Sequence, residues 1–545
     1  MRGAKSAKWV AGAAFIALAA TACGGGNDNN SGSDDAGQKW DPKGIVTMAS
    51  GEPQNALQPA NVMESYGSDV IKSVFAQLVD YDASGKIVME NAESVTTSDS
   101  KTFTVKLKDG WTFHDGTPVT AKSYVDAWNW DANTKNAQQN ASWFSDIKGY
   151  SDVHPEKGAA KAETMSGLKV VDDTTFTIEL TSTLPYFEYK LAYTVFSPLP
   201  ASFYKDPKAA GEHPIGNGAY KFVKWEHKKQ IEVAKYDKYK GDNAAQNGGV
   251  IFKNYTTPEA SYADLRSDKL DVVDQIPTAS LPNFQQDLGD RAVNKPYSAI
   301  TTIGIAYYSK QWKDVDPKVI QGLSMAIDRA TITKTVLNGL RTPATGWVAK
   351  GVLGYQDGAA GDVTKFDPAK AKALIKEGGG VPGNKISIQY NTDGGHKDWV
   401  DAVCNSIRQA TGVDCVGDAK VDFQADLKAR DAKQVKSIYR SGWVLDYPVN
   451  ANFLRDLYGT GAAGNQGGYS NKDFDALTKK ADSAKTLDES VKLYQDAEKS
   501  LVNSMPSIPL WYYNVNGGHS NNVSTVEFGQ DGSPIYNTIK VKATK

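Results

Sequence analysis

The chain has 545 residues, of which 40% are hydrophobic and 10% aromatic, and its formal net charge is −2. This length is too great for one compact core and is enough for two or three lobes. Nucleic-acid-binding proteins concentrate positive charge on one face, so the weakly acidic balance argues against a nucleic-acid partner.

The first residues have the layout of an export signal. Arg2, Lys5 and Lys8 precede an apolar stretch that runs from Trp9 to Ala20. A helix needs about 20 apolar residues to span a bilayer, and this stretch is shorter. A basic head, a short apolar middle and small residues before a cleavage site are typical of a secretory signal, so residues 1–22 are predicted to be removed.

Cys23 directly follows these small residues and precedes a polar tract, GGGNDNNSGSDDAGQK. The Ala20-Thr21-Ala22-Cys23 string resembles a bacterial lipobox, with Ala20 where Leu or Val is usual. The resemblance implies lipidation of Cys23, a flexible tether over residues 23–39 and anchoring on the extracytoplasmic face of the cell membrane. The alternative is a secreted protein with an unmodified Cys23.

Strand and helix signals alternate along the rest of the chain. Alternating apolar and polar residues predict half-buried strands at 103–107, 176–180 and 386–390. Capping residues predict helix starts at Thr120, Thr257, Asp316 and Asp367, and proline follows the last three. The helix after Asp367 should stop at Gly378-Gly379-Gly380. Interleaved strands and helices indicate an α/β (mixed α+β) architecture with mixed sheets.

Cys404 and Cys415 are the only cysteines after Cys23. The first lies on a predicted helix and the second on the strand that follows, so the chain can bring them together. Outside the cytoplasm an isolated pair of this kind is more often a disulfide than a metal site. Two free buried thiols are the alternative.

The sequence carries no arrangement typical of catalysis or metal binding. No two of the six histidines have helical ligand spacing, and there is no Gly-x-Ser-x-Gly elbow or phosphate-binding glycine loop. Ser145 and Lys148 match Ser-x-x-Lys without its companion motifs. We therefore expect no enzyme activity, no metal and no cofactor. The many Trp and Tyr residues instead favour a ligand cleft lined by a subset of them.

Four segments carry recognisable motifs, and in chain order they are KTFTVKLKDGWTFHDGTPVTAKSYVDAW, PIGNGAYKFVKWEHKKQIEVAKYDKY, VDPKVIQGLSMAIDRATI and YRSGWVLDYPVNANFL. These segments resemble the peptide/nickel family (family 5) of extracytoplasmic solute-binding proteins of ABC importers. Together they cover most of the chain from about Ile45 to Tyr513. Within the third segment, Met325-Ala326-Ile327-Asp328-Arg329 carries the match.

The resemblance implies a two-lobed periplasmic-binding-protein-like fold whose larger lobe has an additional domain. Two strands would cross between the lobes as a hinge, and ligand would bind between the lobes. The implied boundaries are residues 40–73, 195–299 and 505–545 for the first lobe, 74–194 for the additional domain and 300–504 for the second lobe.

The fourth segment carries the main expectation about the site. In peptide-binding relatives, a Gly-Trp-x-x-Asp string supplies a carboxylate to the α-ammonium of the ligand, and here it is Gly442-Trp443-Val444-Leu445-Asp446. A buried ammonium must be paired, and a fixed carboxylate meets that demand. The alternative is that Asp446 caps the helix expected near Val449.

Other residues are implied with less specific roles. Arg440 would hold the ligand carboxylate or backbone through its planar guanidinium, or else form an ion pair within the fold. Trp443 would line a side-chain pocket, or else belong to the core. The complete expected peptide-binding set is Asp446, Arg440, Trp443, Gly442, Tyr447, Met63, Ser65 and Tyr66.

The function expected from this resemblance is capture of short peptides by a monomeric, lipid-anchored receptor that delivers them to the transmembrane subunits of an ABC permease. Main-chain hydrogen bonds and roomy, wet pockets would give low sequence specificity. An oligosaccharide or another small solute is the alternative ligand, since one fold serves several ligands. A structural or signalling lipoprotein without a permease is a further alternative.

Overall fold

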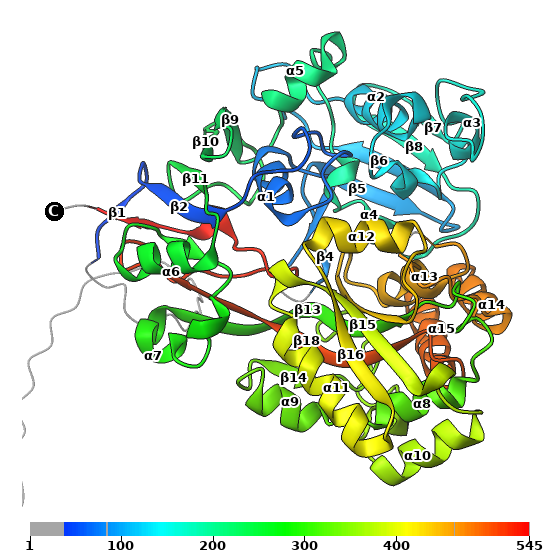
Figure 1. Cartoon of the computed structure of the whole chain (residues 1–545). Coiled ribbons are helices and arrows are strands. Elements are labelled where there is room, and N and C mark those ends of the chain that lie inside the picture. Colours follow the sequence, from blue (N-terminus) through cyan, green and yellow to red (C-terminus); the bar gives the residue numbers. More distant parts are fainter. Residues whose placement is uncertain (1–37, 83–84, 463, 544–545) are drawn as a thin grey trace, which may run out of the picture. The chain divides into compact units, whose positions relative to one another are not determined.

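The computed structural model describes residues 38–82, 85–462 and 464–543 (Figure 1). The expected signal segment and Cys23 lie outside the described residues. Trp40–Lys545 form one compact unit. Among the described residues, no helix combines the length and the apolar character needed to cross a membrane.

The capping signals place the helices correctly. Helix α6 (Pro258–Arg266) begins after Thr257, whose side chain accepts a hydrogen bond from the backbone N–H of Ala260. The starts after Thr120, Asp316 and Asp367 are confirmed as well, and the helix after Asp367 ends at Glu377, before the three glycines. The α-helices of the described residues are α1 (Ser65–Val74), α2 (Ala121–Ala132), α3 (Tyr150–Val153), α4 (Phe187–Lys190), α5 (Pro207–Glu212), α6, α7 (Phe284–Leu288), α8 (Pro317–Met325), α9 (Arg329–Thr335), α10 (Pro368–Glu377), α11 (Lys397–Thr411), α12 (Phe423–Asp431), α13 (Ala451–Tyr458), α14 (Lys472–Asp482) and α15 (Leu487–Ser500).

An 11-stranded mixed sheet forms the framework. Its strands, in spatial order, are β16 (Asp414–Lys420), β15 (Lys385–Asn391), β17 (Ile438–Val444), β13 (Ala292–Ile305), β18 (Ser507–His519), β12 (Val272–Val273), β2 (Ile45–Ser50), β11 (Gly249–Asn254), β10 (Gln230–Lys235) and β9 (Tyr220–Glu226), with β14 (Arg341–Pro343) paired to β18. The β2–β11 and β15–β16 pairs are parallel, whereas β13 is antiparallel to both β17 and β18. The expected mixed-sheet architecture is confirmed.

The two longest strands, β13 and β18, pair along most of their length. Their register runs from Ala292 opposite Gly518 to Gly304 opposite Ser507, and it shifts between Pro296 and Ile300 and again between Thr301 and Thr302. The second half of β13 also pairs with β17, whereas the far end of β18 pairs with β12. These two strands therefore join the two ends of the large sheet.

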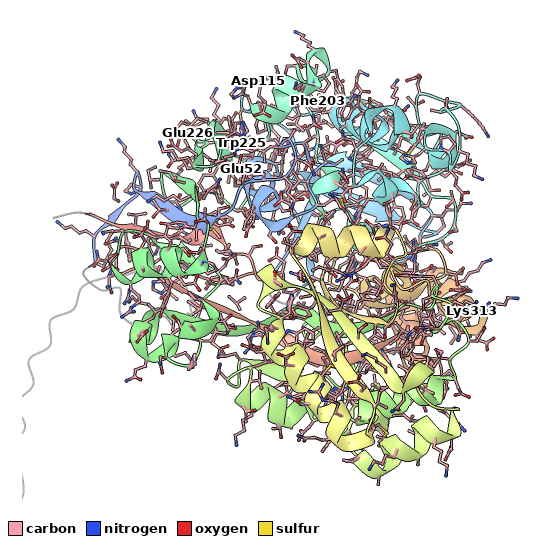
Figure 2. All side chains as sticks on the ribbon, viewed as in Figure 1. Glu52, Asp115, Phe203, Trp225, Glu226 and Lys313 are labelled. Atoms are coloured by element: carbon pink, nitrogen blue, oxygen red, sulfur yellow. A yellow bond between two sulfur atoms is a disulfide. The ribbon has the colours of Figure 1, made fainter. Side chains whose placement is uncertain are left out.

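Smaller sheets lie beside this framework. A four-stranded antiparallel sheet contains β5 (Ala92–Thr97), β6 (Thr102–Leu107), β8 (Thr175–Glu179) and β7 (Leu168–Val170), and two-stranded sheets pair β3 (Val79–Tyr81) with β4 (Ile87–Met89) and β1 (Trp40–Asp41) with β19 (Val541–Lys542). Alternate side chains of β6 are buried, which is the period-2 pattern of its sequence. Trp128 of α2 packs against Phe176 of β8, with ring centroids 5.6 Å apart. Figure 2 shows side chains filling the space between these ribbons.

A disulfide joins Cys404 of α11 to Cys415 of β16, with an S–S distance of 2.00 Å. Both side chains are buried, and Cys404 lies on the buried face of α11, which packs against β16. The bridge therefore fixes a helix to the edge strand that follows it.

Reduction of this bridge should lower the free energy of unfolding by about 2–3 kcal/mol, because it releases a short loop in the unfolded chain. The bridged residues are 11 apart in sequence. Guanidinium denaturation with and without reductant measures the difference, and a Cys404→Ala/Cys415→Ala double variant serves as a control that reductant leaves unchanged. Mass analysis that finds both thiols free in the parent protein would contradict the bridge.

Candidate functional site

Asp446 lies just beyond the end of β17, beside the strand β13. In this part of the sheet Trp443 pairs with Ile300, and Val444 pairs with Ala299. The backbone N–H of Leu445 donates to the carbonyl of Ser298 at 3.0 Å, which continues the pairing by one step. The sheet therefore fixes the backbone on which Asp446 is carried.

Asn452 holds the Asp446 carboxyl in place. The Asn452 Nδ2 donates to Asp446 Oδ2 at 2.9 Å, and the backbone N–H of Asp446 donates to Asn452 Oδ1 at 2.9 Å. The N-cap of α13 is Asn450, and the carboxyl of Asp446 meets a side chain of this helix instead of its terminal N–H groups. The geometry therefore favours a positioned carboxyl over a helix cap.

Burial raises the pKa of the Asp446 carboxyl to about 7. The negative charge of Asp456 adds to this rise, whereas the hydrogen bond from Asn452 and the positive charge of Lys190 oppose it. The residue still keeps some exposed surface. A half-buried carboxyl that is costly to ionise alone is well suited to a cationic group that pairs with it.

Residues from a distant part of the chain approach this carboxyl. Burial raises the pKa of the Tyr193 hydroxyl, and the charge of Asp446 adds to this rise. The Tyr193 ring stacks on Trp143, with centroids 4.1 Å apart. Lys190 Nζ lies 5.4 Å from the centre of the Trp143 ring. These three residues were not predicted from the sequence. The only signal in the sequence was the general surplus of aromatic residues, which does not select individual ones.

The neighbours of Asp446 in the Gly-Trp-x-x-Asp segment have supporting positions. Trp443 Nε1 donates to Asn452 Oδ1 at 3.2 Å, and its ring packs partly against the core. A Cβ atom on Gly442 would lie 2.8 Å from the carbonyl oxygen of Ile300, so glycine allows the two strands to approach. Tyr447 is fully buried, and its hydroxyl donates to Asp456 Oδ2 at 2.6 Å. In this conformation the Tyr447 side chain has no surface open to a ligand.

Arg440 lies on β17, on the same strand as Trp443. Its Nε donates to Asn391 Oδ1 at 2.9 Å, and its guanidinium lies 4.9 Å from the centre of the Phe423 ring. Among the described side chains no salt bridge to Arg440 is found, and its role at the site stays a prediction.

Met63, Ser65 and Tyr66 lie at the start of α1. Met63 is 61% exposed and Tyr66 is 46% exposed, so both have surface available for contact. Glu64 caps the helix by accepting a hydrogen bond from the backbone N–H of Gly67. The role of these three residues at the site stays a prediction.

An ionic and aromatic network lies next to Asp446. Arg455 of α13 donates to Asp146 Oδ1 at 3.0 Å and to the hydroxyl of Tyr186 at 2.8 Å. The same hydroxyl donates to Asp482 Oδ1 at 2.7 Å. Burial alone would raise the pKa of Asp146, but Lys190 and Arg455 hold it well below its ordinary value. The network ties residues near 146–190 to α13 and α14.

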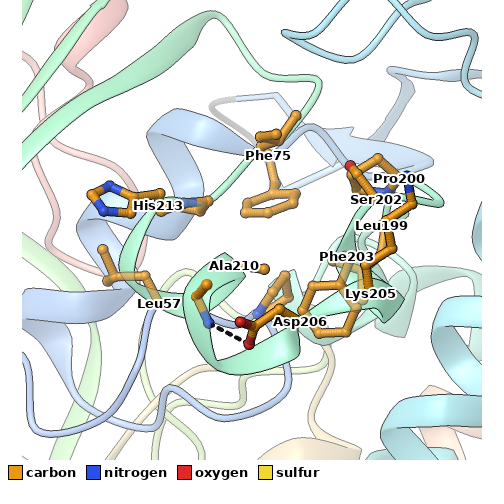
Figure 3. Close-up of a pocket in the computed structure, with 14 residues that line it drawn as sticks. Leu57, Phe75, Leu199, Pro200, Ser202, Phe203, Lys205, Asp206, Ala210 and His213 are labelled. Atoms are coloured by element: carbon orange, nitrogen blue, oxygen red, sulfur yellow. Dashed lines mark hydrogen bonds between the residues drawn. The ribbon is translucent and has the colours of Figure 1, made fainter.

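An apolar cavity of about 260 Å³ lies elsewhere, between Leu57, Phe75 and Phe203 (Figure 3). Asp206 sits at its edge and accepts a hydrogen bond from the backbone N–H of Ala209 at 3.0 Å, as the N-cap of α5. The cavity shares no lining residue with the Asp446 group. It therefore does not contribute to the argument for that site.

The sequence matches the model of one protein family. Residues 86–465 match the family model described as bacterial extracellular solute-binding proteins, family 5 Middle. The chain belongs to this family.

Individual relatives cover nearly the whole chain. The oligopeptide-binding protein OppA of Bacillus subtilis is 27% identical over 526 residues, which are 92% of each chain. The structure of the Escherichia coli murein tripeptide binding protein MppA matches with a TM-score of 0.79 at 22% identity, over 93% of this chain and 100% of that one. OppA of Haemophilus influenzae in complex with RPPGFSPFR gives a TM-score of 0.77 at 22% identity, with coverage of 93% and 100%. The expected two-lobed periplasmic-binding-protein-like fold is therefore confirmed.

Proposed function

We propose that this protein captures short peptides and pairs their α-ammonium group with Asp446. The observation that carries the proposal is the half-buried Asp446 carboxyl, which Asn452 fixes at the end of β17. Its raised pKa shows that ionisation is costly without a partner, and a peptide ammonium would supply one. Relatives named as oligopeptide-binding and murein tripeptide binding proteins support the same ligand class.

The other expected residues complete the proposed site. Arg440 would bind the ligand carboxylate or backbone, since its planar donors fit carboxylate and carbonyl oxygens. Trp443 would line a side-chain pocket while Asn452 holds its indole N–H. Gly442, Tyr447, Met63, Ser65 and Tyr66 belong to the same proposed set. A neutral solute such as an oligosaccharide would not need a carboxylate at this position, and the names of the relatives favour peptides over that alternative.

The division into lobes supports capture by closure. We assign residues 40–73, 195–299 and 505–545 to the first lobe, 74–194 to an additional domain and 300–504 to the second lobe. The hinge would be formed by β13 and β18, which join the two ends of the large sheet and carry two shifts of register. Closure about such a hinge would enclose the peptide and exclude water from the Asp446 pair.

Delivery to a membrane completes the proposal. Lipid on Cys23 would anchor the mature chain outside the cytoplasm, and the polar tract after it would act as a tether. The closed, monomeric receptor would present its surface to the transmembrane subunits of an ABC permease. The membership in a family of extracellular solute-binding proteins supports this arrangement and the absence of catalysis.

Native mass spectrometry of the full chain mixed with a library of dipeptides to hexapeptides tests the proposal. The expected result is binding of one peptide per chain, with many sequences accepted, because main-chain contacts would supply most of the affinity. The matched control is the same library with acetylated N-termini, which should bind far less. A chain that binds neither library would refute the peptide assignment and leave the fold unchanged.

Peptide affinity should depend on pH through Asp446. Only the ionised carboxylate pairs with an ammonium, and the carboxyl has a pKa of about 7 before binding. Affinity should therefore be highest between about pH 7 and 8 and should fall as pH decreases below this range, by up to about tenfold per pH unit. It should also fall at higher pH, where the α-amino group of the free peptide loses its proton. Titration calorimetry in buffers of different ionisation enthalpy should also detect proton release near pH 7. The Asp446→Asn variant, in contrast, should give a flat profile over this range.

A further inference from the structure

Arg341 is the first residue of β14, which pairs with β18 where the register of the large sheet is broken. It lies opposite Tyr513 of β18, and on the other side of β18 three residues of β13, 297–299, face this one tyrosine. Ser298, in the middle of that break, accepts through its carbonyl a hydrogen bond from the backbone N–H of the residue before Asp446. Figure 1 shows β13, β18 and β14 side by side. Arg341 therefore lies on the strands that we assign to the hinge.

One nitrogen of the Arg341 guanidinium makes all of its hydrogen bonds to the described residues. Nη1 donates to the carbonyl of Leu340 at 2.8 Å, to the carbonyl of Asn514 at 3.1 Å and to Asn516 Oδ1 at 2.8 Å. Nε and Nη2 have no partner among the described residues, and neither atom is buried. These two nitrogens form one edge of the guanidinium and present two parallel N–H donors. The contacts of Nη1 thus orient the group, and the edge that fits a carboxylate is open to solvent.

Two tyrosines at the break in register pack beside the guanidinium. The guanidinium carbon of Arg341 lies 4.6 Å from the centre of the Tyr513 ring, and the Tyr297 ring lies 5.7 Å from that of Tyr513. Burial lowers the pKa of Arg341, so part of the hydration of the cation has been removed. A partly desolvated cation attracts a carboxylate more strongly than one in bulk water does.

Among the described residues, no acidic side chain neutralises Arg341. Burial raises the pKa of Tyr297, and the nearby Asp274 and Asp531 add to this rise. Asp531 pairs with Lys72, and neither carboxylate forms a salt bridge with Arg341. The described arginines that do form salt bridges are Arg291, Arg430 and Arg455. A cation that is partly removed from water without an internal counter-ion is well suited to a ligand that supplies one.

Arg329 shows how this protein holds an arginine whose role is structural. Arg329 is 2% exposed, and all three of its guanidinium nitrogens donate within the fold. Nε donates to the carbonyl of Pro509 at 2.8 Å, Nη1 to the carbonyl of Ser324 at 2.9 Å and Nη2 to the hydroxyl of Ser324 at 2.8 Å. Arg341 supports the fold through Nη1 alone, so its open edge is left for another partner.

We infer that Arg341 is a further charged contact for the ligand and that its Nε and Nη2 bind a carboxylate of the captured peptide. The inference rests on the proposed peptide function and adds a substrate class to it. Three strand spacings of about 4.8 Å separate β17, which leads to Asp446, from β14, so the two backbones lie about 14 Å apart. An extended peptide covers that distance in about four residues. The favoured peptides therefore carry a C-terminal or side-chain carboxylate at about this distance from the α-ammonium.

Isothermal titration calorimetry on the full chain tests the inference with two matched sets of alanine peptides. The first set compares peptides of three to six alanines that have a free C-terminus with the same peptides as C-terminal amides. The second set compares glutamate with glutamine at each of positions 2 to 5 of an amidated pentapeptide. In at least one pair the parent should bind the carboxylate member about 10- to 100-fold more tightly, which is the usual effect of hydrogen bonds to a charged group. The Arg341→Gln variant should lose that preference, and the set that responds identifies the source of the carboxylate.

Two further variants make the result specific to the open edge of Arg341. Arg341→Lys keeps the charge without the paired donors, so it should keep only part of the preference, and it replaces Arg341→Gln in the comparison if that variant does not fold. Arg266→Gln is the matched control, because Arg266 is exposed on α6 with its guanidinium 5.8 Å from the Tyr262 ring centre, and it should keep the full preference. If the parent shows no preference, or if the Arg341 variants retain it in full, the inference is overturned and peptide capture stands. If the parent binds none of these peptides, the proposed function fails and the inference fails with it.

Discussion

The Asp446→Asn variant should bind peptides with a free N-terminus about 100-fold more weakly than the parent protein, or worse. Removing one member of a buried, hydrogen-bonded charge pair typically costs about 2–5 kcal/mol, because the other charge is left unpaired. Asparagine keeps the shape of the side chain and an oxygen that can accept from Asn452. The loss therefore reports on the charge and not on a collapsed site. Isothermal titration calorimetry with a single tight-binding peptide measures it.

A second ligand separates the proposed ammonium contact from indirect effects. An N-acetylated copy of the same peptide lacks the α-ammonium, so the parent should bind it weakly, whereas Asp446→Asn should barely distinguish the two ligands. This arrangement is a double-mutant cycle with one change in the protein and one in the peptide. If the variant discriminates between the two peptides as strongly as the parent does, the ammonium is bound elsewhere.

The Arg455→Met variant should lose about 3 kcal/mol of unfolding free energy, because it breaks an ion pair that is largely buried. Its guanidinium donates to Asp146 and Tyr186, and it lies 3.7 Å from Asp482. Methionine keeps most of the apolar stem, so the loss is mainly one of charge. Urea denaturation measures the difference between variant and parent at neutral pH.

The pH dependence of the loss in unfolding free energy tests whether the loss comes from the ion pairs of Asp146. Asp146 has a pKa held below its ordinary value of 3.8, so its ion pairs contribute stability above that pH. The difference between parent and Arg455→Met should be constant above about pH 5 and should shrink as pH falls below about 4. Arg266→Met is the matched control, since Arg266 is exposed and its guanidinium lies 5.8 Å from the Tyr262 ring centre. Equal destabilisation by both substitutions would show that the buried network adds no stability.

The parts of the fold that sequence predicts well are those set by neighbouring residues. A cap such as Thr257 satisfies a backbone N–H three residues away, so its signal is contained in one short window. Alternation in β6 likewise reflects one strand with one buried face. The segment with Asp446 was located by its motif, and the structure adds the position of Asn452 that fixes the carboxyl.

The surroundings of Asp446 could not be read in the same way. Trp143, Lys190 and Tyr193 reach it from a part of the chain more than 250 residues away, and no local spacing records such a contact. Tyr447 is the converse case, a residue whose side chain is not exposed at the site although it is a sequence neighbour of Asp446. It is next to Asp446 in sequence, yet its side chain is fully buried and stacks on Tyr186, because the chain turns between β17 and α13. Adjacency along the chain says little about which face a side chain occupies.

The backbone contact between Leu445 and Ser298 has a mechanical consequence. Ser298 lies within the break in register of β13, between Pro296 and Ile300, and its carbonyl holds the residue next to Asp446. If β13 and β18 form the hinge, an ammonium bound to Asp446 would lie close to the hinge axis, where opening of the lobes displaces atoms least. The free end of the peptide would lie farther out, on a longer lever arm. The first residue of the peptide would then determine whether the peptide binds. The length of the peptide would determine how far the two lobes can close.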